Sequence, residues 1–287
     1  MKLPQFDYQA PGSLDEAVAL LAASEGARPI AGGQSFVPVM AFRLAEPTML
    51  VDLRNIPGLD TIEIGAEGVR LGAMVRWRDI LDDGRLKTAL PLLPEAIDHV
   101  AHYQIRNRGT VGGSLAHADP AAEMPTIALT CNAVIDVVGI KGKRSIKAAD
   151  LFVGPLMTSL ESDEIITSVL LPAWPAGRRW GFQEFSRRRG DFALAGVAVF
   201  YDVDASGKAQ NAHVGAISVG DTPLRLSRAE AALNGRVVDD AAIADAAAAA
   251  SAEVDPAGDI HASARYRKSL VGTLLSRALA AAANRKA

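Results

Sequence analysis

The sequence predicts a mixed fold of strands and helices in two parts, and three observations support this. Hydrophobic residues make up 49% of the 287 residues, enough for a sizeable core and too many for a disordered chain. Short strand and helix patterns alternate as far as residues 172–177, a segment rich in breakers that is typical of a domain boundary. Beyond it, three strand patterns precede a helical tail.

The first part opens with a helix whose ends are marked in the sequence. Ser13 is the expected N-cap, Glu16 completes a capping box, and Gly26 ends the helix. Residues 61–64 and 69–71 flank a glycine-containing turn, which indicates a β-hairpin. Apolar patterns predict further strands and helices, with a lining loop at 151–160: strands at 28–31, 49–53, 133–138, 145–147 and 164–171, and helices at 77–81 and 92–100.

The second part reads as a sheet followed by helices. Strands are expected at 180–186, 196–202 and 212–219. An alanine-dense helix follows at 241–252, with Asp239 or Asp240 as its cap. A longer helix at 262–283 carries one broad apolar stripe, which predicts that it packs on a core.

Charge and hydropathy exclude several classes of partner. The 30 basic and 33 acidic residues give a net charge of −3 and form no basic stripe, so we expect no nucleic acid partner. The first residues lack the apolar core of a signal peptide, and no apolar run is long enough to span a bilayer. We therefore expect a soluble, cytoplasmic protein without a transmembrane segment.

Few residues offer metal or redox chemistry. Cys131 is the single cysteine, so the chain cannot by itself hold an iron–sulfur cluster, which takes four such ligands. Its apolar neighbours predict a buried, inert thiol. His99 and His102 lie three residues apart on an expected helix, but a zinc site needs further ligands and an orienting shell. We expect no metal site.

Two glycine pairs are the clearest functional signal. Residues 109–125 combine Gly112 and Gly113 with hydroxyl residues, a histidine, two carboxylates and two prolines, which predicts a loop rather than a helix or strand. Residues 31–36 repeat the order of strand, glycines and hydroxyl. Successive backbone N–H groups in such turns bind anions, so the two segments could hold one diphosphate between them. The alternative is a plain surface turn at each place.

Motifs of self-sufficient catalysis are missing. The sequence contains no G-x-S-x-G elbow, no H-E-x-x-H pair, no Walker loop and no Rossmann fingerprint. Two glycine-pair segments and few candidate nucleophiles or bases favour a protein that binds a cofactor and leaves the reaction to that cofactor. Arg187, Arg188 and Arg189 are interpreted as a solvated loop, although the adjacent aromatic could reach a ligand.

The order of several motifs resembles the FAD-binding medium subunit of molybdenum hydroxylases, of the carbon monoxide dehydrogenase and xanthine dehydrogenase types. Residues 11–53 with the glycines at 31–35, and above all residues 104–114, carry the resemblance. Residues 152–160, 186–191 and 266–267 extend it over nearly the whole chain.

The resemblance implies an α+β fold. A PCMH-type (vanillyl-alcohol-oxidase-like) FAD-binding domain at 1–176 would consist of two α+β subdomains, about 1–55 and 56–176. The carbon monoxide dehydrogenase flavoprotein-like C-terminal domain at 177–287 would hold a three-stranded antiparallel sheet and helices.

The resemblance also assigns residues to FAD. Residues 31–35 would wrap the diphosphate through backbone N–H groups, and residues 110–114 would close the other side. His117 would lie near the diphosphate and the ribityl region, and Glu123 would face the ribityl hydroxyls. Leu160, Asp191 and Phe192 would lie near the isoalloxazine. Gln183 stands where xanthine enzymes have a lysine, so no NAD site is expected. The complete set of expected FAD-binding residues is Ala31, Gly32, Gly33, Gln34, Ser35, Phe36, Thr110, Gly112, Gly113, Ser114, His117, Ala118, Glu123, Leu160, Asp191 and Phe192.

The implied function is an electron relay without a catalytic residue on this chain. A small partner subunit would carry [2Fe–2S] clusters and a large one molybdopterin, in a dimer of heterotrimers, and FAD here would pass electrons to an external acceptor. Two alternatives stay open: a self-contained FAD-dependent oxidoreductase, and a flavin-free interaction module that retains the fold.

Overall fold

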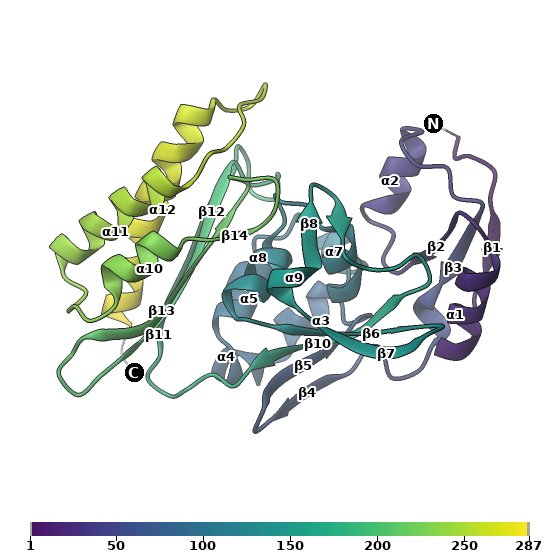
Figure 1. The fold of residues 1–287 in the computed structure, drawn as a ribbon, viewed down its shortest axis with the longest axis horizontal. Helices are drawn as coiled ribbons and strands as arrows, with labels where there is room; N and C mark the ends of the chain where they lie inside the picture. Colours follow the sequence, from purple (N-terminus) through teal and green to yellow (C-terminus); the bar gives the residue numbers. More distant parts are fainter. Residues whose placement is uncertain (1, 286–287) are drawn as a thin grey trace.

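A computed structural model describes residues 2–285 and arranges them along one axis (Figure 1). A three-stranded sheet lies at one end, a five-stranded sheet in the middle, and a four-stranded sheet with the C-terminal helices at the other end. Within the described residues, no helix is both long and apolar enough to cross a membrane.

The first sheet is parallel and small. Its strands β1 (Asp7–Gln9), β3 (Met49–Asp52) and β2 (Ala27–Ile30) pair in that order. Helix α1 (Leu14–Ala23) links β1 to β2, as parallel pairing requires a crossover, and buries Ala17, Val18 and Leu21 against the sheet. The predicted cap is confirmed, because Ser13 Oγ accepts a hydrogen bond from the Glu16 N–H at 3.2 Å. Helix α2 (Phe36–Ala41) and a 3₁₀ turn, η1 (Leu53–Asn55), complete this end.

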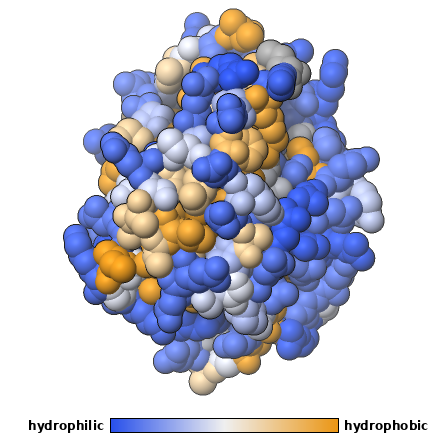
Figure 2. All heavy atoms as spheres, turned by 90° about the vertical axis from the view of Figure 1, so that its right-hand side faces the viewer, coloured by the Kyte–Doolittle hydropathy of each residue, from blue (hydrophilic) through white to orange (hydrophobic). Residues whose placement is uncertain are grey.

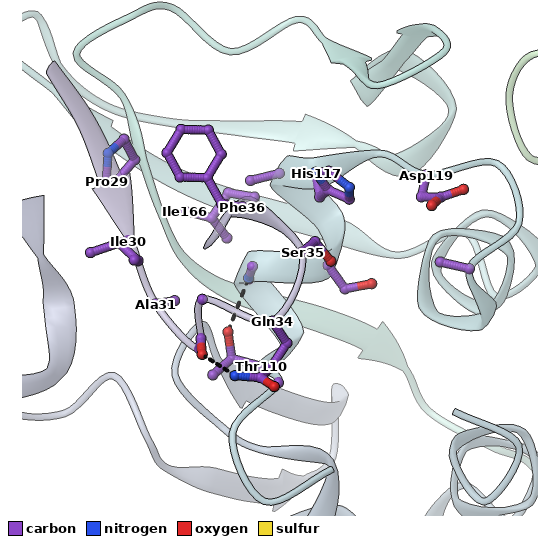
Figure 3. Close-up of a pocket in the computed structure, with 18 of the residues that line it drawn as sticks. Pro29, Ile30, Ala31, Gln34, Ser35, Phe36, Thr110, His117, Asp119 and Ile166 are labelled. Atoms are coloured by element: carbon purple, nitrogen blue, oxygen red, sulfur yellow. Dashed lines mark hydrogen bonds between the residues drawn. The ribbon is translucent and has the colours of Figure 1, made fainter. Parts of the chain in front are cut away.

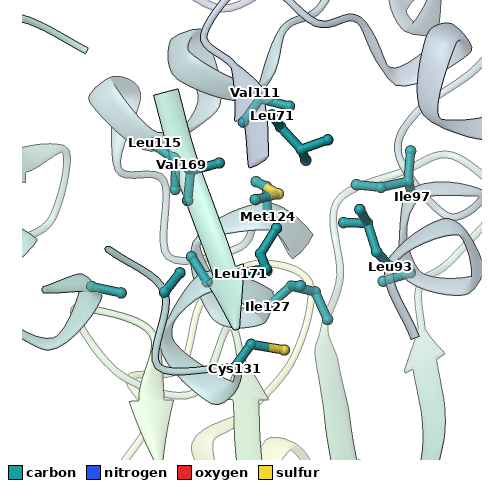
Figure 4. Close-up of a cluster of buried hydrophobic side chains, with 14 of the residues drawn as sticks. Leu71, Leu93, Ile97, Val111, Leu115, Met124, Ile127, Cys131, Val169 and Leu171 are labelled. Atoms are coloured by element: carbon teal, nitrogen blue, oxygen red, sulfur yellow. The ribbon is translucent and has the colours of Figure 1, made fainter. Parts of the chain in front are cut away.

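The central sheet is antiparallel, and helices cover one of its faces. The order is β4 (Ile62–Gly65), β5 (Gly68–Gly72), β10 (Ile165–Pro172), β6 (Val134–Gly139) and β7 (Gly142–Lys147), which confirms the predicted hairpin. Leu71 and Val169 from the sheet pack against Leu115 and Ile127 from the helices (Figure 4). The elements around this sheet are α3 (Trp77–Asp82), α4 (Leu86–Ala89), α5 (Leu92–Ile97), α6 (Tyr103–Arg106), α7 (Val111–His117), α8 (Glu123–Thr130), α9 (Ala148–Leu151), β8 (Phe152–Gly154) and β9 (Met157–Thr158).

The prediction of a continuous loop over 109–125 is wrong. Residues 111–117 form α7, and α8 begins at Glu123. Thr110 caps α7, since its Oγ1 accepts from the Gly113 N–H at 3.2 Å. A Cβ on Gly112 would lie 2.5 Å from the Ala73 Cβ, so this glycine permits a close approach between helix and strand end. Tertiary packing thus outweighs the poor helix propensity of the two glycines.

The C-terminal sheet has four strands rather than the three expected. Strands β11 (Arg179–Phe185), β12 (Ala195–Val203) and β13 (Ala209–Ile217) match the prediction, and the two-residue β14 (Leu224–Arg225) adds an edge. Helices α10 (Ser227–Leu233), α11 (Asp240–Glu253) and α12 (Ala264–Asn284) cover one face. The opposite face packs on α5 and α8, so this sheet forms one wall of the central core.

Candidate functional site

A cleft of about 580 Å³ opens between the N-terminal sheet and the central helices. This volume lies within the range of sites for small molecules and cofactors. Segments far apart in the sequence line the cleft: residues between 28 and 53, between 73 and 77, between 100 and 123, between 156 and 166, and 190–192.

The first glycine segment supplies unused hydrogen-bond donors. It follows β2 directly and turns at Gly33, whose φ of +71° is in the left-handed region that favours glycine. Among the hydrogen bonds of residues 2–285, none uses a backbone N–H of residues 32–36 as its donor. The Gln34 side chain folds back and donates to the Gly32 carbonyl at 3.0 Å (Figure 3). This hydrogen bond stiffens the turn, and the free N–H groups of residues 32–36 are suited to bind an anion.

The second glycine segment cannot act in the way the sequence suggested. The N–H groups of Val111 and Gly112 donate to the carbonyls of Val75 and Ala73, at 2.9 and 2.8 Å. Those of Gly113 and Ser114 donate to the side chain and carbonyl of Thr110. These four donors are occupied within the protein, so this segment offers a smooth wall of small residues and the Ser114 hydroxyl rather than a second set of N–H groups.

The two segments touch and face each other. A Cβ on Gly32 would lie 2.1 Å from the Arg108 carbonyl oxygen, so only glycine fits where the two backbones meet. A Cβ on Gly113 would lie 3.7 Å from the Ala31 Cβ, which shows that this glycine faces the first segment. Figure 3 shows residues 31–36 passing in front of Thr110 and α7. The two segments therefore lie opposite each other, and a larger side chain at Gly113 would enter the space between them.

The structure brings fifteen of the sixteen predicted FAD residues to this one cleft. The exception is Ala118, which is buried at the C-cap of α7 and accepts a hydrogen bond from the Leu156 N–H at 3.2 Å. His117 is half-buried, and burial lowers its pKa, which favours a neutral ring near pH 7. Phe192, with 72% of its surface exposed, lies at the rim.

Two acidic side chains lie at the junction of the cleft and the C-terminal sheet, Glu123 buried and Glu184 half-buried. Glu123 lines the cleft and is 9% exposed; burial, assisted by the charge of Asp119, raises its pKa to about 7. Burial and the charge of Glu123 raise the pKa of Glu184 on β11 to about 9. The Glu184 Oε2 atom is buried and has no partner among the described residues. Two such carboxyls cannot both be ionised cheaply, so the pair retains a proton near neutral pH.

Several lining residues were missed from the sequence. The cleft is also lined by Met74, Trp77 and Ile105, which were not predicted. Leu156 and Thr158 of the β8–β9 hairpin line it too, but they belong to the expected lining loop. Apolar residues on short elements carry no signal that separates a cleft wall from a core. The expected lining loop at 151–160 does reach the cleft, although it forms the end of α9 and this short hairpin.

The remaining chemical groups are structural. Cys131 is buried as predicted, and burial raises its pKa to about 12, so the thiol keeps its proton. His99 lies beyond the end of α5 rather than on the expected helix, and packs edge-to-face on Phe182 at 5.0 Å. Arg189 pairs with Asp98 at 2.7 Å, and Arg187 contacts the His261 ring, both at the surface.

Comparison with known proteins agrees with this geometry. The family of FAD-binding domains in molybdopterin dehydrogenases matches residues 4–174, and the carbon monoxide dehydrogenase flavoprotein C-terminal domain matches residues 180–282. The nicotine 6-hydroxylase medium subunit of Paenarthrobacter nicotinovorans is 43% identical over 285 residues, covering 99% of this chain and all of that one.

Solved structures show the same fold along the full length. The carbon monoxide dehydrogenase of Hydrogenophaga pseudoflava contains a chain that is 38% identical, with a TM-score of 0.96 and full coverage of both chains. A chain of quinoline 2-oxidoreductase from Pseudomonas putida 86 is 40% identical with a TM-score of 0.94, covering 99% of this chain and 98% of that one.

Proposed function

Because this chain belongs to the family of FAD-binding medium subunits of molybdenum hydroxylases, we propose that it relays electrons from a [2Fe–2S] cluster on a small partner subunit to an external acceptor. A large partner subunit would hold molybdopterin and oxidise the substrate. The observation that carries the proposal is the row of unpaired N–H groups at residues 32–36, opposite the glycine-lined wall of α7. A cofactor with a diphosphate fits this arrangement.

The residues of the cleft fit FAD in three respects. The donors at 32–36 would hold the diphosphate, and the Ser114 hydroxyl could add a further bond from the opposite wall. Glu123, when ionised, would accept hydrogen bonds from ribityl hydroxyls. Leu160 and Phe192 would pack on the ring, with Asp191 at its edge.

Bound FAD would supply the redox chemistry, since a flavin can accept electrons singly and release them in pairs. The chain itself would bind, orient and shield it. We infer no general base on this chain, in line with the family, and assign catalysis on the substrate to another polypeptide.

The relatives support this division of labour. Their names refer to enzymes that act on nicotine, carbon monoxide and quinoline, three very different molecules. The folds of the two solved relatives nevertheless match this chain with TM-scores of 0.96 and 0.94. A fold that stays constant while the substrate changes is expected if the substrate pocket lies on another chain and this one performs the shared step.

The surface offers places for partner subunits to dock. Figure 2 shows the end of the molecule with the three-stranded sheet, where hydrophobic residues gather in patches between hydrophilic ones. Phe42, Leu44, Leu156 and Met157 are each more than half exposed, and Leu156 borders the cleft. Contiguous apolar patches, rather than single exposed residues, mark interaction surfaces, and we propose that the patches in Figure 2 form such a surface. We propose that the complex is a cytoplasmic dimer of heterotrimers. We also propose that this chain divides into its two domains near residue 176.

The test is to purify the full chain alone and together with the products of neighbouring reading frames. We expect FAD to remain bound to the chain, and an iron–sulfur chain and a molybdopterin chain to co-purify with it. Bound FAD with turnover of an organic substrate by this chain alone would instead identify a self-contained oxidoreductase. A colourless chain that cannot be loaded with FAD would contradict the proposal and indicate an interaction module.

A further inference from the structure

A buried arginine lies behind the cleft, in the first turn of α12. Arg267 is 6% exposed, and its guanidinium donates in several directions. One terminal nitrogen donates to the Leu194 carbonyl at 2.7 Å and to the hydroxyl and carbonyl of Ser218 at 2.9 and 3.2 Å. The other donates to the Asp259 carboxylate at 2.7 Å. One planar group therefore joins three separate segments.

Two of these segments lead directly into the cleft. Leu194 follows Asp191 and Phe192, which line its rim. The Ser218 N–H donates to the Pro120 carbonyl at 2.9 Å, and Pro120 adjoins Asp119, another lining residue. Arg267 thus supports one lining segment directly and another through Ser218.

Burial of Ala193 and Leu194 fixes the end of the rim segment, whereas residues 190–192 before them have few fixed contacts. The Leu194 N–H donates to the Phe185 carbonyl at 2.8 Å, and Gly190 lies against the backbone of Ala101. The Arg189–Asp98 ion pair is largely exposed, and such pairs contribute little to stability.

Burying a guanidinium is costly unless its hydrogens are satisfied, and the Arg267 Nε atom is buried without a hydrogen-bond partner among the described residues. An apolar side chain of similar volume would often be as stable or more so, so the charge is not explained by stability alone. What the planar fork offers is geometric: it holds several acceptors in one rigid plane, whereas the three donors of an ammonium rotate on a flexible stem.

We propose that Arg267 is a positioning residue for the flavin ring, holding the 190–194 segment, and through Ser218 the 119–123 turn, in register with the cleft. The proposal rests on FAD binding there as described above. Arg267 would then affect the ring end of the cofactor and not the diphosphate, because none of its hydrogen bonds reaches residues 32–36, which would bind the diphosphate.

The experiment compares FAD with ADP, which has the diphosphate but no flavin ring, by titrating the full chain with each. In Arg267→Lys we expect FAD to bind about tenfold more weakly, the loss expected from one charge-assisted hydrogen bond, with a changed visible spectrum of the bound flavin. ADP affinity should stay within about twofold of wild type. Arg265→Lys, an exposed neighbour on the same turn, is the matched control and should change neither.

Each other outcome is informative. Equal losses for FAD and ADP would show a general structural role, and unchanged FAD binding with an unchanged spectrum would also overturn the inference. If Arg267→Lys does not fold, Ser218→Ala, which removes one acceptor, is used instead. It should weaken FAD binding more than ADP binding, by less than tenfold, and equal or no loss for the two ligands would overturn the inference. A wild-type chain that binds no FAD would contradict the proposed function instead.

Discussion

Gly33→Val is expected to abolish FAD retention. Gly33 has a φ of +71°, and a valine held there costs about 1–3 kcal/mol, so the turn would relax toward negative φ. Relaxation would rotate the adjacent N–H groups away from the cleft. Losing two hydrogen bonds to a charged diphosphate, at about 1.5 kcal/mol each, weakens binding by about 100-fold. The measurement is the flavin content of the purified chain and its FAD affinity by titration.

Gly113→Val should give the same loss by obstructing the space and by a clash with the cap of α7, rather than by a forced positive φ. Its Cβ would lie 2.8 Å from Thr110 Oγ1 and would project toward Ala31, into the space between the two segments. The matched control is Gly207→Val, because Gly207 has a φ of +80° with no atom within 4 Å of an added Cβ, in the turn between β12 and β13. Full flavin occupancy in both cleft variants, or equal loss in the control, would refute the assignment of the diphosphate site.

Glu184→Gln is expected to make stability less dependent on pH. The pKa of Glu184 is raised to about 9, so the folded state holds a proton that the unfolded chain releases near pH 4.5. Stability from this group is complete below pH 4.5 and is lost as the pH rises toward 9. Glutamine carries no such proton. The variant should match wild type near pH 5 and exceed it at pH 9 by on the order of 2–4 kcal/mol, observed as a higher thermal midpoint.

The control for this prediction is Glu67→Gln, an exposed glutamate in the β4–β5 turn, which should follow wild type at every pH. Glu123→Gln provides a second check. Because the charge of Glu123 helps to raise the pKa of Glu184, removing it should also flatten the profile. If the stability of wild type and of Glu184→Gln changes with pH in the same way, the pKa of Glu184 is not raised, and the prediction is wrong.

The sequence correctly predicted those elements that are determined by residues close together in the chain. Ser13 and Glu16 define the start of α1, and the glycine-containing turn defines the β4–β5 hairpin. The turn at Gly33 follows from the same reasoning, because a strand that must reverse sharply needs a residue tolerant of positive φ. The apolar stripe of α12 likewise predicted a buried helix face.

Elements that depend on distant contacts could not be predicted in this way. Helix α7 forms across Gly112 and Gly113 because Thr110 caps it and Ala73 packs against it, and Ala73 lies far back in the sequence. The same contacts occupy the N–H groups that the glycine pattern seemed to offer. Glu184 drew no attention, since only the folded sheet places it beside Glu123, and the two-residue β14 is too short to carry a pattern.

A crystal structure of the full chain with FAD is the most direct test of the central claim. We expect the diphosphate oxygens within about 3 Å of backbone N–H groups of residues 32–36, facing α7 across the cleft. A diphosphate bound elsewhere, or bound with those N–H groups still unpaired, would contradict the account.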